Sequence, residues 1–170
     1  MVTDKNTYLA EEPFNEPPKL VYEGELTNIY CSENQAIMYS KETLIWLGLN
    51  KSKDGSQELL RIILQMKSVD RLWYNLAKHT IVVQGAEHNL SVLSIDSTKL
   101  LFTIKKRIPP TDKKKVLGCL IKKSDQVEVI YEGGIIELHD LAINNVTSKK
   151  LSGLSSSIQI YSEAEESCVK

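Results

Sequence analysis

Apolar residues recur along the chain at equal steps of 46 residues. Leu44, Leu90 and Ile136 keep this step, and each lies in a short apolar run bounded by polar or glycine-containing segments. Two further sets keep the same step: Trp46, Val92 and Leu138, and also Ile37, Val83 and Val129. This shared step predicts three copies of one structural unit rather than a single continuous core.

Each copy is expected to centre on a β-hairpin, because two strand-length apolar runs flank a short turn. The turns contain the glycine and polar residues that hairpins require: Ser40–Glu42, Gly85–His88 and Glu132–Gly134. A further run precedes each hairpin, at Leu26–Cys31, Leu72–Leu76 and Val116–Ile121. Another follows it, at Glu58–Leu64, Lys99–Ile104 and Lys149–Leu154. The pattern therefore predicts four short strands in each unit.

Four strands repeated at a step near 40 to 45 residues (about one propeller blade) are typical of radially arranged sheets. In the third copy, the segment from Gly133 to Leu141 is similar to the end of a WD blade, with His139-Asp140 where Trp-Asp is usual. The chain thus resembles the divergent WD40-like β-propeller superfamily, at the level of fold, over about residues 20 to 161. The expected fold is all-β, with three four-stranded antiparallel blades at about residues 24–64, 68–107 and 113–154.

Three blades predict an incomplete ring, because closure normally needs about four to eight. One spare strand is expected at each end, at Leu20–Glu23 and Ser157–Tyr161. The ring would be completed by missing sequence, by a partner, or by a second copy in a six-bladed ring. Each case implies a non-catalytic scaffold or adaptor subunit that associates through blade faces and strand edges.

The candidate partner-binding residues are the apolar and aromatic side chains of the two spare strands and one aromatic pair. Trp73 and Tyr74 are included because adjacent strand residues point to opposite faces, so at least one ring could reach the surface. Trp46 shares the repeat phase of Val92 and is expected in the core. The candidates are Leu20, Tyr22, Trp73, Tyr74, Ile158, Ile160 and Tyr161.

Net charge, cysteine spacing and the length of apolar runs limit the ligands and the cellular location that the sequence predicts. The formal net charge of −1 gives no overall attraction to nucleic acid or anionic membranes. Three cysteines without metal-ligand or paired spacing predict reduced thiols, hence a cytoplasmic or nuclear protein without metal or cofactor. The first residues carry no leader pattern, and no apolar run is long enough for a membrane span. Residues 1–19 are predicted to be a flexible acidic, proline-rich arm and residues 162–170 a polar tail.

A basic segment from Lys105 to Lys123 is the strongest local charge signal. Pro109-Pro110 predicts that it forms a loop between blades. Such a loop could be a solvated surface, or it could contact the phosphates of RNA, DNA or a phosphoinositide. The candidate phosphate contacts are Lys105, Lys106, Arg107, Lys113, Lys114 and Lys115.

A PH-like barrel is the alternative fold, with seven strands followed by a helix at residues 112–123 and a peptide- or phosphoinositide-binding function. Val116, Leu120 and Ile121 have helical spacing, whereas Gly118 and the repeat phase favour a strand. His139 and Asp140 could act as a general-base pair, but a hydrogen-bonded pair that stabilises a blade is favoured. No catalytic constellation is visible, and the chain is predicted not to be an enzyme.

Overall fold

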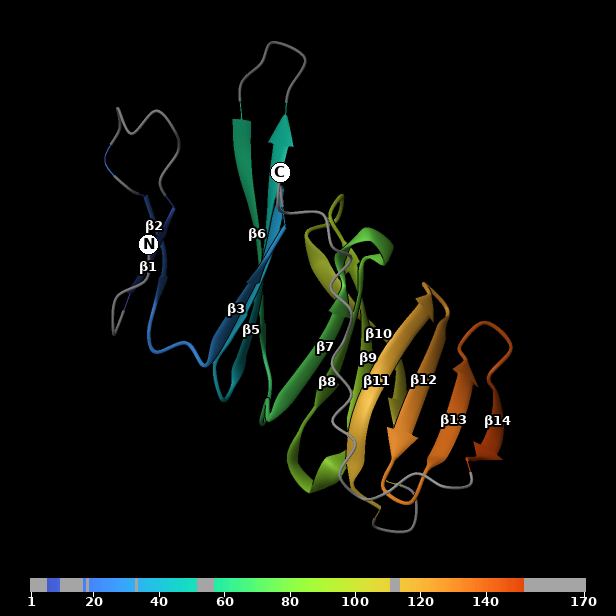
Figure 1. Cartoon of the computed structure of the whole chain (residues 1–170). Helices are drawn as coiled ribbons and strands as arrows, with labels where there is room; N and C mark the ends of the chain where they lie inside the picture. The colour runs from blue at the N-terminus through green and yellow to red at the C-terminus, as the bar shows by residue number, and fades with distance from the viewer. Residues whose placement is uncertain are drawn as a thin grey trace, which may run out of the picture.

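The computed structural model describes residues 6–9, 17, 19–32, 34–51, 57–110 and 114–151. These residues form three four-stranded antiparallel sheets and one two-stranded sheet, which lie side by side in chain order (Figure 1). The all-β prediction is confirmed, and the sheets do not close into a ring or barrel. Among the residues described, no helix is long and apolar enough to cross a membrane.

Within each four-stranded sheet, every strand pairs with the next strand in the sequence. The first sheet contains β3 (Asn28–Cys31), β4 (Gln35–Tyr39), β5 (Thr43–Lys51) and β6 (Gln57–Gln65). The second contains β7 (Arg71–Asn75), β8 (Thr80–Gln84), β9 (Leu90–Asp96) and β10 (Leu101–Ile108). The third contains β11 (Val116–Lys123), β12 (Gln126–Tyr131), β13 (Ile135–Asp140) and β14 (Asn145–Lys150). Two short 3-10 helices, η1 (Leu76–Lys78) and η2 (Ala86–His88), lie in turns of the second sheet.

The third sheet excludes the alternative fold and corrects one predicted strand boundary. The PH-like helix is absent, because Val116–Lys123 is strand β11 and pairs with β12. The last strand begins at Asn145, earlier than the predicted Lys149. The reason is a short turn that Asp140 stabilises: its carboxylate accepts hydrogen bonds from the backbone N–H groups of Ala142 and Ile143, at 3.1 and 3.2 Å. The chain therefore reverses at once after β13.

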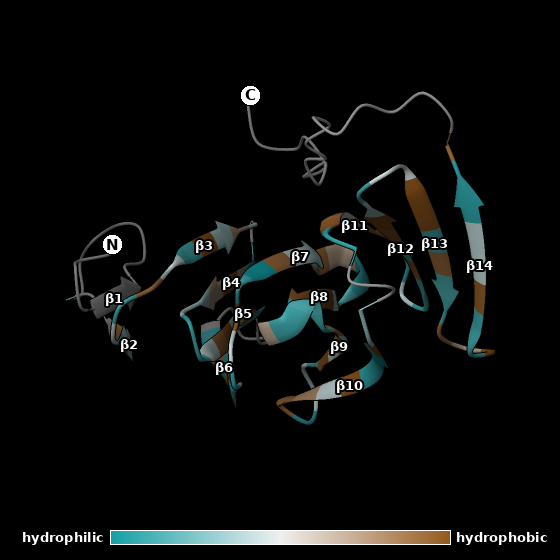
Figure 2. Ribbon diagram, turned by 90° about the horizontal axis from the view of Figure 1, so that it is seen from below, coloured by the Kyte–Doolittle hydropathy of each residue, from teal (hydrophilic) through white to brown (hydrophobic). Residues whose placement is uncertain are grey.

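Apolar side chains of neighbouring sheets form two cores. Between the first and second sheets, Leu44 and Trp46 pack with Ile81 and Leu93. Between the second and third sheets, a second core contains Val82, Leu90, Val92, Val127 and Val129 among others. Figure 2 shows brown, apolar stretches on the strands within the stack, whereas β14, exposed along its length, carries teal and white stretches as well. Burial of each sheet against its neighbour therefore supplies most of the apolar stabilisation.

Equivalent residues of β5, β9 and β13 are 46 residues apart. Between the strands that precede them, β4 and β8, equivalent residues are only 45 apart, a slip of one residue. Tyr39 pairs with Leu44, whereas Gln84 pairs with Leu90, so the second hairpin turn is one residue longer. The structural counterpart of Ile37 is therefore Val82, and Val83 corresponds to Met38. Because strand side chains alternate between faces, this slip reverses the face on which each residue lies.

The N-terminal part of the chain contains a strand that the predicted flexible arm did not include. β1 (Asn6–Leu9) pairs antiparallel with β2 (Lys19–Glu23) in a separate two-stranded sheet beside the first blade. The predicted spare strand at Leu20–Glu23 is thus paired along one edge. The spare strand expected at Ser157–Tyr161 lies outside the described residues.

Candidate functional site

The two ends of the three-blade stack differ in chemistry. The face of the first sheet that points away from the second sheet is apolar, and we call it the first-blade face. Met38, Ile45 and Leu47 form its buried centre, on which Tyr22 and Leu26 pack. Ile63 lies beside Ile45 on the same face and is 45% exposed. The first-blade face therefore has the apolar composition of a buried surface, but it is only partly covered.

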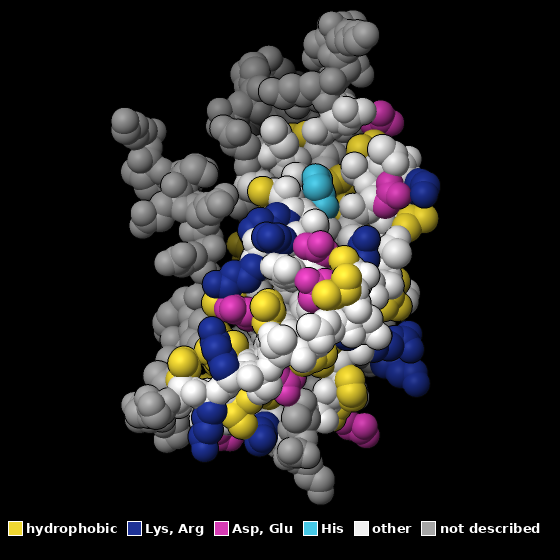
Figure 3. All heavy atoms as spheres, turned by 90° about the vertical axis from the view of Figure 1, so that its right-hand side faces the viewer, with side chains coloured by type: hydrophobic (Ala, Val, Ile, Leu, Met, Phe, Trp, Pro, Cys, Tyr) yellow, Lys and Arg dark blue, Asp and Glu magenta, His cyan; other side chains and the backbone are white. Residues whose placement is uncertain are grey.

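At the opposite end, the third sheet has a mixed face, which we call the third-blade face. Glu128 occupies the position at which Ile37 and Val82 are fully buried in the first and second sheets. Its carboxylate pairs with the Lys122 ammonium at 3.3 Å. Viewed from this end in Figure 3, lysine and acidic side chains lie between apolar ones. A charge pair at the centre of this face is typical of a terminal repeat that faces water.

Of the predicted partner-binding residues of the first spare strand, Tyr22 lies by the first-blade face. Leu20 is 51% exposed, whereas Tyr22 packs on the apolar centre of that face. Ile158, Ile160 and Tyr161 lie outside the described residues. Among the described candidates of the two spare strands, the structure therefore places Tyr22 on the first-blade face.

The aromatic pair Trp73 and Tyr74 is divided between the two faces of β7. Trp73 is 5% exposed and belongs to the core between the second and third sheets, so its assignment to partner contact is corrected. Tyr74 points to the other face and is half-buried against Tyr30, with ring centroids 4.7 Å apart. Because side chains alternate along β7, the two rings do point to opposite faces, as predicted. Neighbouring sheets, however, cover both faces of the strand. Trp46 is buried as predicted.

The basic segment is mostly strand rather than loop, and its cations are dispersed. Lys105, Lys106 and Arg107 lie on β10. Lys106 pairs with Val92 and Arg107 with Ser91, so these two side chains point to opposite faces. Lys114 and Lys115 directly precede β11, and Lys113 lies outside the described residues. The described cations of this segment therefore lie on more than one face.

His139 and Asp140 do not form the predicted hydrogen-bonded pair, because successive strand residues point to opposite faces. His139 Nε2 lies 3.2 Å from Glu137 Oε2, and the Tyr131 hydroxyl donates to the same oxygen at 3.2 Å. Asp140 instead accepts a hydrogen bond from the Gln126 amide at 3.0 Å. This bond and the two from the following turn lower the pKa of Asp140.

The cluster of Tyr131, Glu137 and His139 is buried between the second and third sheets, and sequence reasoning missed it. Burial lowers the pKa of His139, nearby Lys106 lowers it further, and Glu137 opposes the change. The i, i+2 spacing of Glu137 and His139 could have indicated that both side chains lie on one face of the strand. The position of Tyr131 beside them could be found only from the strand register. No third metal ligand accompanies them among the residues described.

Two cations of the second sheet hold the third sheet through its backbone, which sequence reasoning also missed. The Arg71 guanidinium donates to the carbonyls of Val116 and Leu117 at 3.1 and 3.2 Å. The Lys78 ammonium donates to the carbonyls of Ile121 and Lys122 at 3.3 and 2.8 Å. These bonds fix β11 at both ends against the second sheet.

The described cysteines are free thiols. Cys31 is exposed, whereas Cys119 is buried in the core between the second and third sheets. Burial raises the pKa of the Cys119 thiol, so it stays protonated at neutral pH. Cys168 lies outside the described residues.

The fold resembles that of known propellers, although no protein-family model and no curated protein sequence matches the chain. The crystal structure of the WD40 domain of SCAP from fission yeast is similar, with a TM-score of 0.58 and 11% sequence identity. The match covers 88% of this chain and 38% of that domain's chain. The predicted resemblance to a WD40-like propeller is thus confirmed at the level of fold, and the chain spans well under half of that structure.

Proposed function

We propose that this chain, which has the fold of three WD40-like blades, is a non-catalytic assembly subunit that binds a second copy of itself through its first-blade face. The observation that carries the proposal is the difference between the two end faces. An apolar face bearing a half-exposed isoleucine favours association. A face centred on the Glu128–Lys122 pair favours contact with water.

The edges of β1 and β2 extend this surface. A two-stranded sheet is only marginally stable alone in water, and added strands stabilise it. Tyr22 and Leu26 already tie this sheet to the first blade. A partner that adds strands at this edge would cover the first-blade face at the same time.

Nucleic acid and phosphoinositide binding are less well supported. Both require several cations on one accessible surface. Lys106 and Arg107 point to opposite faces of β10, and the Lys122 cation is paired with Glu128. The protein-binding role therefore remains the preferred function.

The test is the molar mass of the full chain by light scattering across a concentration series. The wild-type chain is expected to exceed the 19.2 kDa of one copy as concentration rises, because the first-blade face is only partly covered. Ile63→Glu should weaken this association about tenfold or more, because it buries an unpaired charge in the contact.

Ile104→Glu is the matched control. Ile104 is 47% exposed but lies on β10 of the second sheet, away from the first-blade face. Its replacement should leave association unchanged. A well-folded monomer at every concentration would contradict the proposal, as would equal effects of the two substitutions.

A further inference from the structure

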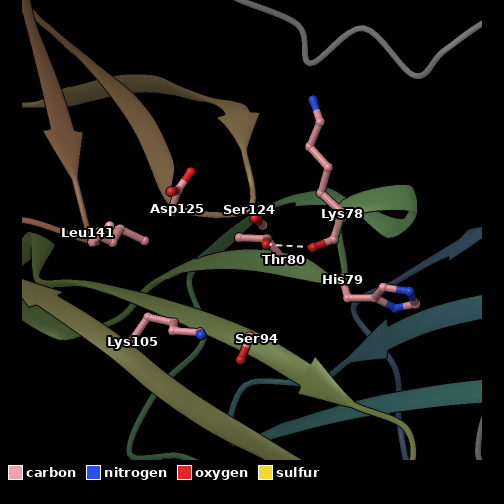
Figure 4. A pocket seen from close by; sticks show the side chains of 9 residues that line it. Lys78, His79, Thr80, Ser94, Lys105, Ser124, Asp125 and Leu141 are labelled. Carbon is pink, nitrogen blue, oxygen red and sulfur yellow. Dashed lines mark hydrogen bonds between the residues drawn. The ribbon is translucent and has the colours of Figure 1, made fainter.

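A cavity of about 230 Å³ opens between the second and third sheets (Figure 4). The second sheet supplies Lys78 and Thr80 at the β7–β8 turn and Ser94 on β9. The third sheet supplies Ser124 in the β11–β12 turn and Leu141 after β13. The cavity thus lies where turns of two blades meet.

A β-bulge directs Lys105 into this cavity. The register of β10 on β9 shifts between Ile104 and Lys106, so Lys105 is the extra residue of the strand. Bulges redirect a side chain away from the normal alternation. In Figure 4 the Lys105 side chain extends toward Ser94. It makes no ion pair or hydrogen bond within the described part of the chain, so its charge is available to a ligand.

Some of the other polar side chains that line the cavity already make hydrogen bonds within the protein, and others do not. The Thr80 hydroxyl donates to the Lys78 carbonyl at 2.9 Å, and the Lys78 ammonium is engaged by β11 carbonyls. The hydroxyls of Ser94 and Ser124 have no hydrogen-bond partner among the described residues. Three donors, from Lys105 and these two serines, are therefore available at one site.

The walls are fixed before any ligand arrives. The Leu141 N–H donates to the Asp125 carbonyl at 2.7 Å, which joins the two turns of the third sheet. The Ile95 N–H donates to the carbonyl of His79 at 2.9 Å, which ties the β7–β8 turn to β9. Lys78 then links that turn to β11. A preformed site loses little entropy when it binds.

Size and charge limit the ligand. The cavity is smaller than the roughly 300 to 1,000 Å³ of sites for drug-sized ligands, so it fits one small group. Its lining holds two lysines and one carboxylate, that of Asp125, which in Figure 4 points away from Lys105. An ammonium with nearby hydroxyl donors suits a tetrahedral oxyanion.

We propose that this cavity binds the phosphate monoester of a phosphorylated serine or threonine on a partner protein. Such a group carries a charge of about −1.5 to −2 and several strong acceptor oxygens. A side chain on a flexible peptide can enter a recess between two turns, whereas a bilayer presents its headgroups as a broad surface. The site is separate from the first-blade face, and the inference does not depend on the proposed function.

The test is an NMR titration of the 15N-labelled full chain with a blocked Gly-phosphoserine-Gly tripeptide. Saturable shifts are expected at Lys105, Ser94 and Ser124, and the unphosphorylated tripeptide should cause none. Lys105→Ala should weaken binding about tenfold, because a charged hydrogen bond is lost. Ser94→Ala should weaken it less. Lys99→Ala is the control, because Lys99 is an exposed lysine of the same sheet outside the cavity.

Several outcomes would overturn the assignment. One is the absence of saturable shifts at millimolar phosphopeptide, and another is equal binding by the Lys105→Ala and Lys99→Ala variants. Inorganic phosphate that binds as tightly as the phosphopeptide would show a general anion site instead. Binding to phosphatidylcholine vesicles that contain phosphatidic acid, but not to the phosphopeptide, would identify a lipid headgroup as the ligand.

Discussion

Trp46 lies over the backbone of its own strand, and this position depends on Gly48. A Cβ atom at residue 48 would lie 2.6 Å from Cζ2 of the Trp46 ring. The ring cannot move easily, because it is buried and its Nε1 donates to the Gln35 side chain at 3.0 Å. The repeat phase predicted that Trp46 is buried. It could not predict the contact with Gly48, which depends on the side-chain rotamer.

Gly48→Ala is therefore expected to lower the free energy of unfolding by about 1–3 kcal/mol, the usual range for overpacking. Urea unfolding of the purified chain measures this change. In a Trp46→Phe background, the same substitution should cost less, because the smaller ring leaves room. An equal cost in both backgrounds would place the strain elsewhere.

His139 predicts a pH dependence of stability. Its folded-state pKa lies below the ordinary 6.5, mainly because burial disfavours the charged form. As pH falls below about 6.5, the unfolded chain binds a proton that the folded chain excludes. The free energy of unfolding should therefore fall, by up to about 1.4 kcal/mol per pH unit. His139→Gln should remove this part of the slope, as measured by urea unfolding at about pH 7.5 and about pH 5.5. An unchanged slope would contradict the prediction.

At the scale of elements, strand type and order followed from the sequence, whereas details set by turns did not. Val116–Lys123 is a strand because Val116, Cys119 and Ile121 pack against the second sheet, and this packing outweighs the helix-compatible spacing of its apolar residues. The one-residue slip at Val82 and the early start of β14 both arise from turn geometry. The spacing of apolar residues says little about the length of a turn. Neither the slip nor the early start of β14 could therefore be predicted from that spacing.

Arg71 joins two elements, and its loss should loosen one of them. Arg71→Ala removes two hydrogen bonds to β11 carbonyls and the stacking of the guanidinium on Trp73, where the distance to the ring centroid is 5.0 Å. Amide exchange in β11 should become about tenfold faster or more, because charged hydrogen bonds contribute roughly 1.5–3 kcal/mol each. Exchange in β3 to β6 should not change.

Arg107→Ala is the control for this measurement, because Arg107 is an exposed arginine on β10. It should leave β11 exchange unaltered. Equal acceleration in both variants would show that Arg71 does not hold the third sheet through its carbonyls.

For the whole molecule, the sequence predicted three blades but not the difference between their two open faces. The 46-residue step paired Ile37 with Val83, which concealed that Glu128 corresponds to Ile37 and Val82. Only the strand register, set by the hairpin turns, reveals this equivalence. The two ends therefore differ: one face is apolar, and the other has a central ion pair.

Glu128→Ile should restore apolar character to the third-blade face and create a second associating surface. Ile130 and Leu138 lie on this face, and an isoleucine at residue 128 would join them. Light scattering should then give a higher molar mass than the wild type at equal concentration. Glu132→Ile, which changes an exposed turn residue instead, should have a smaller effect. Identical masses for the wild type and the Glu128→Ile variant would show that the charge pair does not limit association.

The bonds from Arg71 and Lys78 to β11 end on main-chain oxygens, and this has a consequence for sequence divergence. Every residue has a backbone carbonyl group, whatever its side chain. These bonds can therefore form with any side chain at the bonded positions of β11. Substitutions along this strand can accumulate while the two cations still hold the third blade in place. A propeller joined in this way can keep its architecture after its sequence has ceased to resemble that of other propellers.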